Sequence, residues 1–521
     1  MSTNITNITN NSTIKEDIPA AEDQRSHIRR SSLMLSPAWD AENASLRHLG
    51  DLDDDDLIPV AYFPLKQTKQ QDDSSSKKSN DEPTKKMGMH PSASVGDWSI
   101  ASGNTTDTSI YSQHGSSDDI WQDVPMGAPD AILGIAQAFR QCQEPHKVNV
   151  CVGAYRDDNG NSYVLPSVRA AEKILWENQE PKEYLPIEGD KDFVARALKF
   201  AYGPSMDIET HLAAVQTLSG TGACAIGGRF LAQFWKNHPI YVPDPTWSNH
   251  IKIFNQCGLD CRKYRYYNRS TNDLDLEGML EDLNRARDGS IILLHACAHN
   301  PTGCDPSLEQ WKSIIGIVRQ KHHVCFFDSA YQGFASGSAE DDAQAFRYAV
   351  SQHVPILLAQ SFAKNFGLYG ERVGTLSVVC GDAEQRDHIL SELRLIIRPL
   401  YSSPPRHGSS IVKTVLGDPA LKEQYYEECA GMALRIQKMR LKLVQALEKA
   451  GSRHDWSHIT GQIGMFAFTG MNEEMCRRLT EEFSIFLTMN GRISMAGLNR
   501  NNLEYVAASI HSVTDGNSIS L

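Results

Sequence analysis

The sequence predicts an α/β protein, with a large domain built on a mostly parallel sheet of about seven strands and a smaller α/β domain after it. Short apolar runs alternate with longer amphipathic stretches such as SLEQWKSIIGIVRQKH and GMLEDLNRARD. That alternation is the pattern of repeated strand–helix units. Most of the runs are continuously apolar, which indicates strands that helices cover on both faces.

The expected strands are, in chain order, HLAAVQTL, PIYV, CRKYRYY, SIILLHAC, VCFFDS, PILLAQSF and TLSVVC. After about residue 425 a long helical pattern begins, YYEECAGMALRIQKMRLKLVQALEKAG, and leads to shorter strands in GQIGMFAFTG and GRISMAGL. This last part is expected to form the smaller domain.

Composition divides the chain further. Residues 1–120 are rich in Ser, Asn, Asp, Lys and Thr, a composition that cannot offset the entropy of ordering. We expect a disordered, low-complexity extension there, which could also tether or regulate the protein. Residues 121–162 are expected to form an N-terminal segment and part of the small domain, residues 163–424 the large domain, and residues 425–521 the C-terminal small domain.

The bulk properties exclude several classes of partner. The 521 residues carry a net charge of −13, which disfavours nucleic acid, and no apolar run reaches the ~18 residues that span a bilayer. The 11 cysteines show no CxxC spacing, which indicates reduced thiols in an intracellular protein. The N-terminus carries acidic residues and lacks a hydrophobic segment, so it is neither a signal peptide nor a typical transit peptide.

Candidate functional residues stand where the expected strands end. In doubly wound sheets, ligands bind at the carboxyl ends of the strands. We therefore expect one cleft that gathers the polar residues placed at these ends. They are Ser219, Gly220 and Thr221 of SGTGA, Asp244 and Trp247 of YVPDPTWSNH, His295 to Asn300 of LLHACAHNPTG, Asp328 and Tyr331 of CFFDSAYQG, and Ser361 and Lys364 of SFAK.

The stretch SGTGACAIGG follows a strand and opens a helix. Its glycines let backbone N–H groups approach an anion, and the helix N-terminus favours negative charge, so a phosphate is the natural ligand. The stretch also fits the dinucleotide pattern GxGxxA, with Asp244 about twenty residues further on. Tight packing of a helix on a strand is the structural alternative.

Lys364 lies in SFAKNFGLYGERVG, directly after an apolar run. A desolvated amine beside another cation, here Arg372, has a lowered pKa and can form a Schiff base with an aldehyde. Arg372 could also bind a phosphate. Asp328 could hold a pyridinium N–H, and Tyr331 could donate a hydrogen bond into the same cleft. A surface lysine with a buried stem and a helix-capping aspartate are the alternatives.

The motif HACAHNPTGC suggests a metal site through His295, Cys297, His299 and Cys304, but structural zinc sites use other spacings. We expect no metal here and regard these residues as packed or supporting groups. Two arginines, Arg398 in IIRPLYSSPP and Arg492 in NGRISMAGL, could each bind a carboxylate through two parallel hydrogen bonds. Together they would select a dicarboxylic substrate, whereas singly each is more often a surface charge.

Taken together, these stretches resemble the aspartate aminotransferases, which depend on pyridoxal 5′-phosphate. The resemblance covers residues 121 to 514, and in RPLYSSPP and QWKSI it is greatest to the mitochondrial subtype. The motifs that carry it are VCVGAYRDDNGNSYVLPSVR, EYLPIEGD, SGTGA, PTWSNH, LLHACAHNPTG, FFDSAYQGFASG, SFAKNFGLYGERVG, IIRPLYSSPP and GQIGMFAFTG.

This resemblance implies the type I fold of pyridoxal-phosphate enzymes and a role for each matching residue. Lys364 would form the internal aldimine and carry the proton, while Asp328 would pair with the pyridine nitrogen and His250 would lie behind it. The implied contacts are Ser219, Gly220, Thr221, Ser361 and Arg372 with the phosphate, together with Tyr184 of a partner subunit; Tyr331 and Asn300 with the phenolic oxygen; and Trp247 stacked on the ring.

For the substrate, the resemblance implies that Arg492 binds the α-carboxylate, that Arg398 of the partner subunit binds the distal carboxylate, and that Gly153 closes over the ligand. The expected enzyme is a homodimer that exchanges the amino group between L-aspartate and 2-oxoglutarate by a ping-pong mechanism. An aromatic aminotransferase of the same fold and a NAD-dependent oxidoreductase are the alternatives.

Two departures from the family pattern stand out. Ser403 replaces the usual Asn of YSNPP, which removes an amide near the substrate-binding arginine and could soften the preference for dicarboxylates. The first 120 residues have no family counterpart, so they leave the compartment open. The subtype favours the mitochondrial matrix, whereas the acidic N-terminus favours the cytoplasm.

Overall fold

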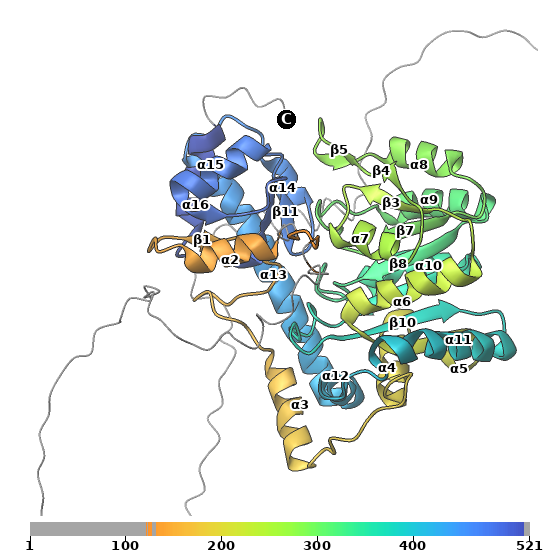
Figure 1. Ribbon diagram of the computed structural model, residues 1–521. Coiled ribbons are helices and arrows are strands. Elements are labelled where there is room, and N and C mark those ends of the chain that lie inside the picture. Colours follow the sequence, from red (N-terminus) through yellow and green to blue (C-terminus); the bar gives the residue numbers. More distant parts are fainter. Residues whose placement is uncertain (1–120, 122, 128–131, 515–521) are drawn as a thin grey trace, which may run out of the picture. The chain divides into compact units, whose positions relative to one another are not determined.

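The computed structural model describes residues 121, 123–127 and 132–514. The extension expected over residues 1–120 lies outside the described residues, as do residues 515–521. One sheet of seven strands forms the centre of the fold, as the sequence predicts (Figure 1). From one edge to the other, the strands are β2 (Leu212–Leu218), β10 (Val373–Val379), β9 (Ile356–Ser361), β8 (Val324–Ser329), β7 (Ile291–His295), β3 (Ile240–Asp244) and β4 (Cys261–Arg265).

The sheet is parallel except at β10, which pairs antiparallel with both of its neighbours, β2 and β9. Successive side chains of a strand point to opposite faces of the sheet, so a strand buried on both sides must be apolar throughout. In β7, Ile291 and Leu293 belong to one hydrophobic cluster, and Ile292 and Leu294 belong to the other. This division confirms the prediction drawn from the continuous apolar runs.

Helices cover both faces of the sheet (Figure 1). Those that share a cluster with Ile291 and Leu293 are α6 (Ser219–Phe234), α7 (Asn249–Gln256) and α11 (Ala383–Tyr401). Those on the opposite side are α4 (Lys191–Tyr202), α8 (Leu276–Arg285), α9 (Leu308–Gln320) and α10 (Gln344–Ser351). Shorter elements lie between them: α5 (Ile208–His211), β5 (Tyr267–Asn268), β6 (Asp273–Leu274) and η3 (Asp341–Ala343).

The two ends of the described chain meet in a smaller assembly (Figure 1). Strand β1 (Val148–Asn149), which follows α2 (Leu133–Gln141), pairs in parallel with β12 (Ile485–Phe486). A second small ladder joins β11 (Phe466–Phe468) to β13 (Arg492–Ser494). The remaining elements of this part are α14 (Ser457–Gly461), α15 (Glu473–Phe483), η4 (Met495–Gly497) and α16 (Leu503–Thr514).

The helix α13 (Pro419–Lys449) is 31 residues long, which corresponds to about 45 Å. It begins with proline at its first position, and the Asp418 side chain accepts hydrogen bonds from the backbone N–H groups of Ala420 and Leu421. It packs against α3 (Pro166–Glu177), α12 (His407–Gly417), α14 and α16. The border expected between residues 424 and 425 falls inside this helix, and the expected domain limits stay predictions.

Two further sequence expectations concern membranes and cysteines. Over the ranges that the structure describes, none of the helices is both long and apolar enough to cross a bilayer. The 11 cysteines all lie in the described residues and form no disulfide there, and eight of them, Cys151 included, are buried. Burial raises the thiol pKa of seven buried cysteines: Cys224, Cys297, Cys304, Cys325, Cys380, Cys429 and Cys476.

Candidate functional site

The start of α6 and the end of β9 form a small polar cradle. Ser219 Oγ lies 2.9 Å from Ser361 Oγ, and Ser219 has a φ of 62°, in the left-handed region. At Gly220 an added Cβ would stand 3.2 Å from the Cβ of Ser361 and 3.8 Å from a carboxylate oxygen of Asp328, so a side chain would fill this space. Thr221 lies on the same first turn, where free N–H groups favour an anion.

Asp328 ends the apolar part of β8 and is held from behind. Its Oδ2 lies 3.1 Å from Nε2 of His250, whose Nδ1 lies 2.9 Å from Oγ1 of Thr246. Thr246 in turn lies 3.2 Å from Nε2 of His295, the residue directly beside Asp328 in the sheet. Burial alone would raise the pKa of Asp328, but the hydrogen bond and charge of His250 lower it below its ordinary value.

Lys364 follows β9 and directs its amine into the same space. Nζ donates to the carbonyl oxygen of Gly153 at 2.8 Å and stands 5.0 Å from the centre of the Tyr369 ring. Burial, with the nearby charges of Arg372 and Arg492, lowers the pKa of Lys364 to about 8. A substantial fraction of this amine is therefore neutral near physiological pH, which an ordinary lysine is not.

Arg492, the first residue of β13, is a buried cation that faces this cluster. Its Nη1 donates to Oδ1 of Asn300 at 3.1 Å, its Nη2 donates to the Cys151 carbonyl at 3.1 Å, and its guanidinium carbon lies 4.0 Å from the centre of the Phe466 ring. Burial lowers its pKa, and its Nε is buried without a hydrogen-bond partner in the described part of the chain. A buried guanidinium held only by neutral groups is suited to binding a carboxylate.

Three other predicted residues border the same space. Tyr331 is buried, and this burial raises the pKa of its phenol despite the charge of Arg492. Trp247 is half-buried, with its ring 5.0 Å from that of His250 in an edge-to-face arrangement. An added Cβ at Gly153 would stand 2.6 Å from a carbon of the Phe466 ring, so only glycine fits this close approach.

Arg372 opens toward solvent at the end of the loop that carries Lys364. It has a φ of 53°, and its Nη1 donates to the Tyr369 carbonyl at 3.0 Å. Its charge reaches Lys364, because it is the larger of the two cationic contributions that lower the pKa of that amine. Arg372 therefore lies near enough for its charge to act on Lys364, and its role in binding a phosphate stays a prediction.

Tyr184 and Arg398 stand apart from this cluster. Tyr184 is 86% exposed and borders a cavity of about 650 Å³ that is also lined by Tyr401, Ser402 and Ser403. Nη1 of Arg398 donates to Oγ of Ser402 at 2.5 Å. Ser402 has a φ of 67°, and the N–H of Ser403 donates to the Tyr401 carbonyl at 2.7 Å, which closes a tight turn at this edge.

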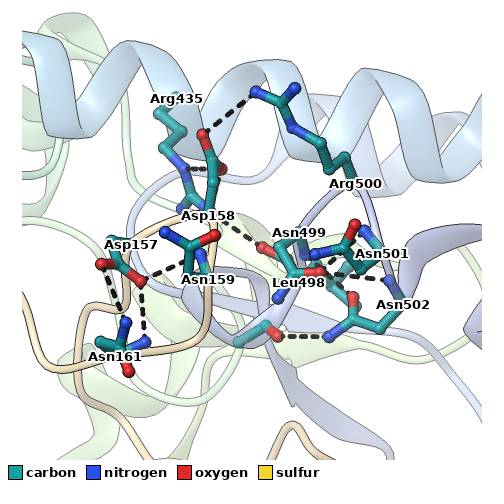
Figure 2. A network of polar contacts seen from close by, with 11 residues as sticks. Asp157, Asp158, Asn159, Asn161, Arg435, Leu498, Asn499, Arg500, Asn501 and Asn502 are labelled. Carbon is teal, nitrogen blue, oxygen red and sulfur yellow. Dashed lines mark hydrogen bonds and ion pairs between the residues drawn. The ribbon is translucent and has the colours of Figure 1, made fainter.

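A polar network holds the segment that follows Gly153 (Figure 2). Oδ1 of Asp158 accepts from both Nε and Nη2 of Arg435, at 3.0 and 2.8 Å, and its Oδ2 lies 3.7 Å from Arg500. Asp157 closes its own short turn through Asn161. Because Arg435 belongs to α13, the segment that carries Gly153 is tied to the smaller assembly.

The motif HACAHNPTGC contributes packing and support. The rings of His295 and His299 lie 4.2 Å apart, and Tyr266 stacks on His299 at 3.8 Å. Burial lowers the pKa of His295 to about 3 and that of His299 well below its ordinary value, so both imidazoles are neutral. Within residues 121–514 as described, no three His, Cys, Asp or Glu side chains gather in a way that could hold a metal ion.

Several residues of the site carried no chemical signal in the sequence. Thr246 links two histidines, Phe466 lies against both Arg492 and Gly153, and the hydroxyl of Tyr369 accepts from the Tyr155 N–H at 2.8 Å. Threonine, phenylalanine and tyrosine are ordinary core residues. Their place at the end of a predicted strand or beside a candidate residue is the one signal that could have found them.

Similarity to known proteins identifies the family of this chain. A family model described as "Aminotransferase class I and II" matches residues 145–510. The mitochondrial aspartate aminotransferase of Gallus gallus is 48% identical over 397 residues, which cover 76% of this chain and 94% of that protein.

The chain belongs to the class I and II aminotransferases.

Solved structures of aminotransferases agree with this assignment. The aspartate aminotransferase from Saccharomyces cerevisiae cytoplasm has a TM-score of 0.74 and 42% identity, over 76% of this chain and 98% of that one. The aromatic-amino-acid aminotransferase from Burkholderia pseudomallei, solved with pyridoxal phosphate covalently bound, has a TM-score of 0.74 and 39% identity, over 76% and 100%.

The residues of this chain fit the cofactor of the family. The cradle of Ser219, Gly220 and Ser361 suits a phosphate, and the ionised Asp328 suits a protonated ring nitrogen. The amine of Lys364 has the lowered pKa that an imine-forming lysine needs. Each of these features belongs to the described residues themselves.

Proposed function

We propose that this aminotransferase is an aspartate aminotransferase, which moves the amino group between L-aspartate and 2-oxoglutarate to give oxaloacetate and L-glutamate. The observation that carries the proposal is the buried amine of Lys364, with its pKa of about 8, in one space with the ionised Asp328 and the buried guanidinium of Arg492. The family assignment and the names of the relatives support the same reaction.

When bound, pyridoxal 5′-phosphate supplies an aldehyde that takes up the amino group and a ring that accepts electron density from the substrate's Cα. Ser219, Gly220, Thr221, Ser361 and Arg372 would hold its phosphate. Asp328 would hold its pyridine nitrogen, Tyr331 and Asn300 its phenolic oxygen, and Trp247 its ring. These assignments follow the family motifs that the chain carries.

Lys364 is the group that moves a proton. In its neutral form, Nζ can take the proton from Cα of the substrate, and it would deliver that proton to the aldehyde-derived carbon of the cofactor within the same half-reaction. Its pKa of about 8 lies close to physiological pH, which is the condition under which one amine serves well as both base and acid. The remaining residues orient the Cα–H bond toward this amine and exclude water.

Asp328 must stay ionised for this chemistry. A buried carboxylate would ordinarily take up a proton, and His250 prevents this through its hydrogen bond at 3.1 Å. The chain from His250 through Thr246 to His295 fixes the orientation of that imidazole. His250 therefore acts on the cofactor through Asp328.

The two arginines would divide the substrate between them. Arg492 would bind the α-carboxylate, for which its buried guanidinium has no competing anion among the described residues. Arg398 would bind the distal carboxylate. Two such bidentate contacts select dicarboxylic substrates over aromatic ones.

Arg398 and Tyr184 reach a substrate only if a second copy of the chain supplies them. Both lie at an exposed edge, and Tyr184 borders the cavity of about 650 Å³ described above. We therefore propose a homodimer with shared active sites. Mixing the variants Lys364→Ala and Arg398→Ala should restore about a quarter of the wild-type activity, because half of the hybrid sites are intact. No recovery above the separate variants would reject a shared site.

Absorbance provides the direct test of the cofactor and its lysine. The purified protein should be yellow with bound pyridoxal phosphate, and borohydride reduction should fix the label on Lys364 in peptide mass spectra. The colour should bleach on addition of L-aspartate and return with 2-oxoglutarate. A colourless protein that binds NAD would instead support the oxidoreductase alternative, and a label on another residue would overturn the assignment of Lys364.

We also propose the mitochondrial matrix as the compartment, because relatives such as the Gallus gallus protein carry that designation. Residues 1–120 are the obvious candidate for a targeting or regulatory segment. Fluorescent fusions of the full chain and of residues 121–521 test both points in parallel with the kinetics. Cytoplasmic fluorescence of both fusions would reject the matrix, and equal activity and location would reject a role for the extension.

A further inference from the structure

Two carboxylates that the proposed reaction does not use lie directly behind the loops of the site. Asp342, in η3, is 5% exposed. Its Oδ2 accepts from the backbone N–H groups of Gly333 at 2.8 Å and Ala335 at 3.1 Å, and its Oδ1 accepts from the N–H of Ser336 at 3.1 Å. One carboxylate thus accepts from three backbone N–H groups of the loop that follows β8.

Asp305 repeats this arrangement on the neighbouring loop, which follows β7. Its Oδ2 accepts from the N–H of Ala298 at 2.5 Å, and its Oδ1 accepts from the N–H of His299 at 2.8 Å. In the part of the chain that the structure describes, neither Asp305 nor Asp342 is paired with a lysine or arginine. Backbone N–H groups that point at one place form a nest for an anion, and here the anion is a side chain of the same protein.

Each anchored loop carries one of the two donors expected at the phenolic oxygen of the cofactor. Asn300 directly follows His299, whose N–H is bound by Asp305. Tyr331 begins the turn that Asp342 holds, because the Tyr331 carbonyl accepts from the N–H groups of Phe334 and Ala335 at 2.8 and 3.0 Å. The N–H of Ala335 is shared between this carbonyl and Asp342.

We propose that Asp305 and Asp342 are a pair of positioning residues that fix Asn300 and Tyr331 through the backbones of their loops. The inference rests on the proposed function, because it assigns to these loops the task of presenting two hydrogen-bond donors to the cofactor. Neither carboxylate touches the substrate. Each acts by giving backbone N–H groups of its loop a fixed acceptor.

Burial of the two carboxylates is costly, which argues against an incidental placement. Burial raises the pKa of Asp305 to about 6 and that of Asp342 to about 7, and in the case of Asp342 the charge of Asp305 adds to the increase. Cys297, in the loop that follows β7, has a pKa raised by burial and by both of these charges. Asp305 and Asp342 therefore lie close enough for the charge of one carboxylate to affect the pKa of the other.

Reciprocal variants separate positioning from a general role in stability. Asp342→Asn and Asp305→Asn keep the shape but replace one acceptor oxygen with an NH₂ group, which leaves a loop N–H facing a donor. Asp341→Asn is the matched control, because Asp341 is the exposed neighbour of Asp342 and bonds only its own turn. Hydrogen exchange of the protein without cofactor is measured in peptides that cover residues 296–304 and 331–337.

We expect Asp342→Asn to increase exchange about tenfold in residues 331–337 and to leave 296–304 nearly unchanged, with the opposite result for Asp305→Asn. In the holoenzyme, both variants should move the pH-dependent colour change of the bound cofactor to higher pH, because two donors to its ionised oxygen are less well placed. Asp341→Asn should change neither measurement.

Other outcomes would overturn the proposal. Equal exchange in both peptides for each variant, or an unchanged colour transition, would show that the carboxylates serve the fold alone. If an Asn variant does not fold, the matching Glu variant, Asp342→Glu or Asp305→Glu, is measured in its place, since it keeps the charge and both oxygens. If the Glu variants do not fold either, a local role of the two carboxylates is rejected. A wild-type protein that binds no pyridoxal phosphate refutes the proposed function, whereas the exchange experiment still tests the loops.

Discussion

The cofactor end of the site and its outer edge are built in opposite ways. At the cofactor end, Lys364, Asp328 and Arg492 are buried and held by the same chain, as the contact of Asp328 with His250 at 3.1 Å shows. At the outer edge, Tyr184 is 86% exposed and Arg398 is held only by Ser402 in the tight turn that ends α11.

This difference indicates which tasks one chain can perform alone. Tuning an amine and keeping a carboxylate ionised require desolvation and fixed partners, and a single chain supplies both. Recognition of the far end of the substrate needs a charge that reaches in from outside. Under the proposed homodimer with shared active sites, the first task should survive dissociation of the subunits, whereas the second should not.

The largest effect is expected at the cofactor end. Lys364→Ala should lower the transamination rate by on the order of a thousandfold or more, because no other amine is placed to move the proton. Stopped-flow measurement of the half-reaction with L-aspartate checks this. Lys173→Ala, at an exposed position on α3, is the control and should keep full activity. A residual rate within tenfold of the wild-type rate would show that Lys364 is not the group that moves the proton.

At the outer edge, Arg398→Ala should reduce kcat/KM for L-aspartate by about a hundredfold and leave an aromatic substrate such as L-phenylalanine within a few-fold. The reason is that only the dicarboxylate loses a bidentate partner. Steady-state kinetics on both substrates give the ratio. Arg394→Ala, one turn earlier on α11 and paired with Glu188, is the matched control for loss of a cation on this helix. Equal losses on both substrates would contradict the assignment.

The pH dependence of cofactor capture probes the cofactor end alone. Only the neutral amine attacks an aldehyde, so with a pKa of about 8 the rate of association with pyridoxal phosphate should rise about tenfold per pH unit below pH 8 and level off above it. Stopped-flow absorbance on the cofactor-free protein measures this profile. A midpoint near 10, the ordinary value for lysine, would show that burial and the charges of Arg372 and Arg492 do not act as described.

The smallest effect is expected from the departure at Ser403. Ser403→Asn restores the amide of the family pattern beside the turn that holds Arg398, and should raise the preference for L-aspartate over L-phenylalanine by a few-fold. The ratio of kcat/KM values measures it. Ser403→Ala, which removes the hydroxyl without adding an amide, is the control and should not raise the preference. A lower preference in the Asn variant would mean that Ser403 is the better fit to this edge.

Much of the fold could be predicted because burial on both faces leaves a direct trace in the sequence. Most strands of the central sheet appear as continuous apolar runs, the edge strand β4 with its sequence CRKYR being an exception, and the residues at or just after the strand ends include Asp328, Ser361 and Lys364. The antiparallel direction of β10 could not be predicted in this way. Its run, TLSVVC, is buried on both sides like the others, and burial does not depend on strand direction.

The supporting contacts of the site could not be predicted from the sequence either. Phe466 meets Gly153 and Arg492 from a distant part of the chain, and nothing in FAF distinguishes it from a core residue. In the sequence, Asp305 and Asp342 look like ordinary acidic residues of loops. Their role depends on the backbone N–H groups that the fold brings to them. The sequence shows which residues could take part in chemistry, but it does not show the geometry that supports them.

The pairing of β1 with β12 has a consequence for synthesis. Val148 finds its partner in Ile485, so the ribosome must release nearly the whole polypeptide before this ladder can close. Until then β1 lacks its partner strand, and the emerging protein stays open to chaperones. The first described strand of the chain is therefore among the last to find its partner during synthesis.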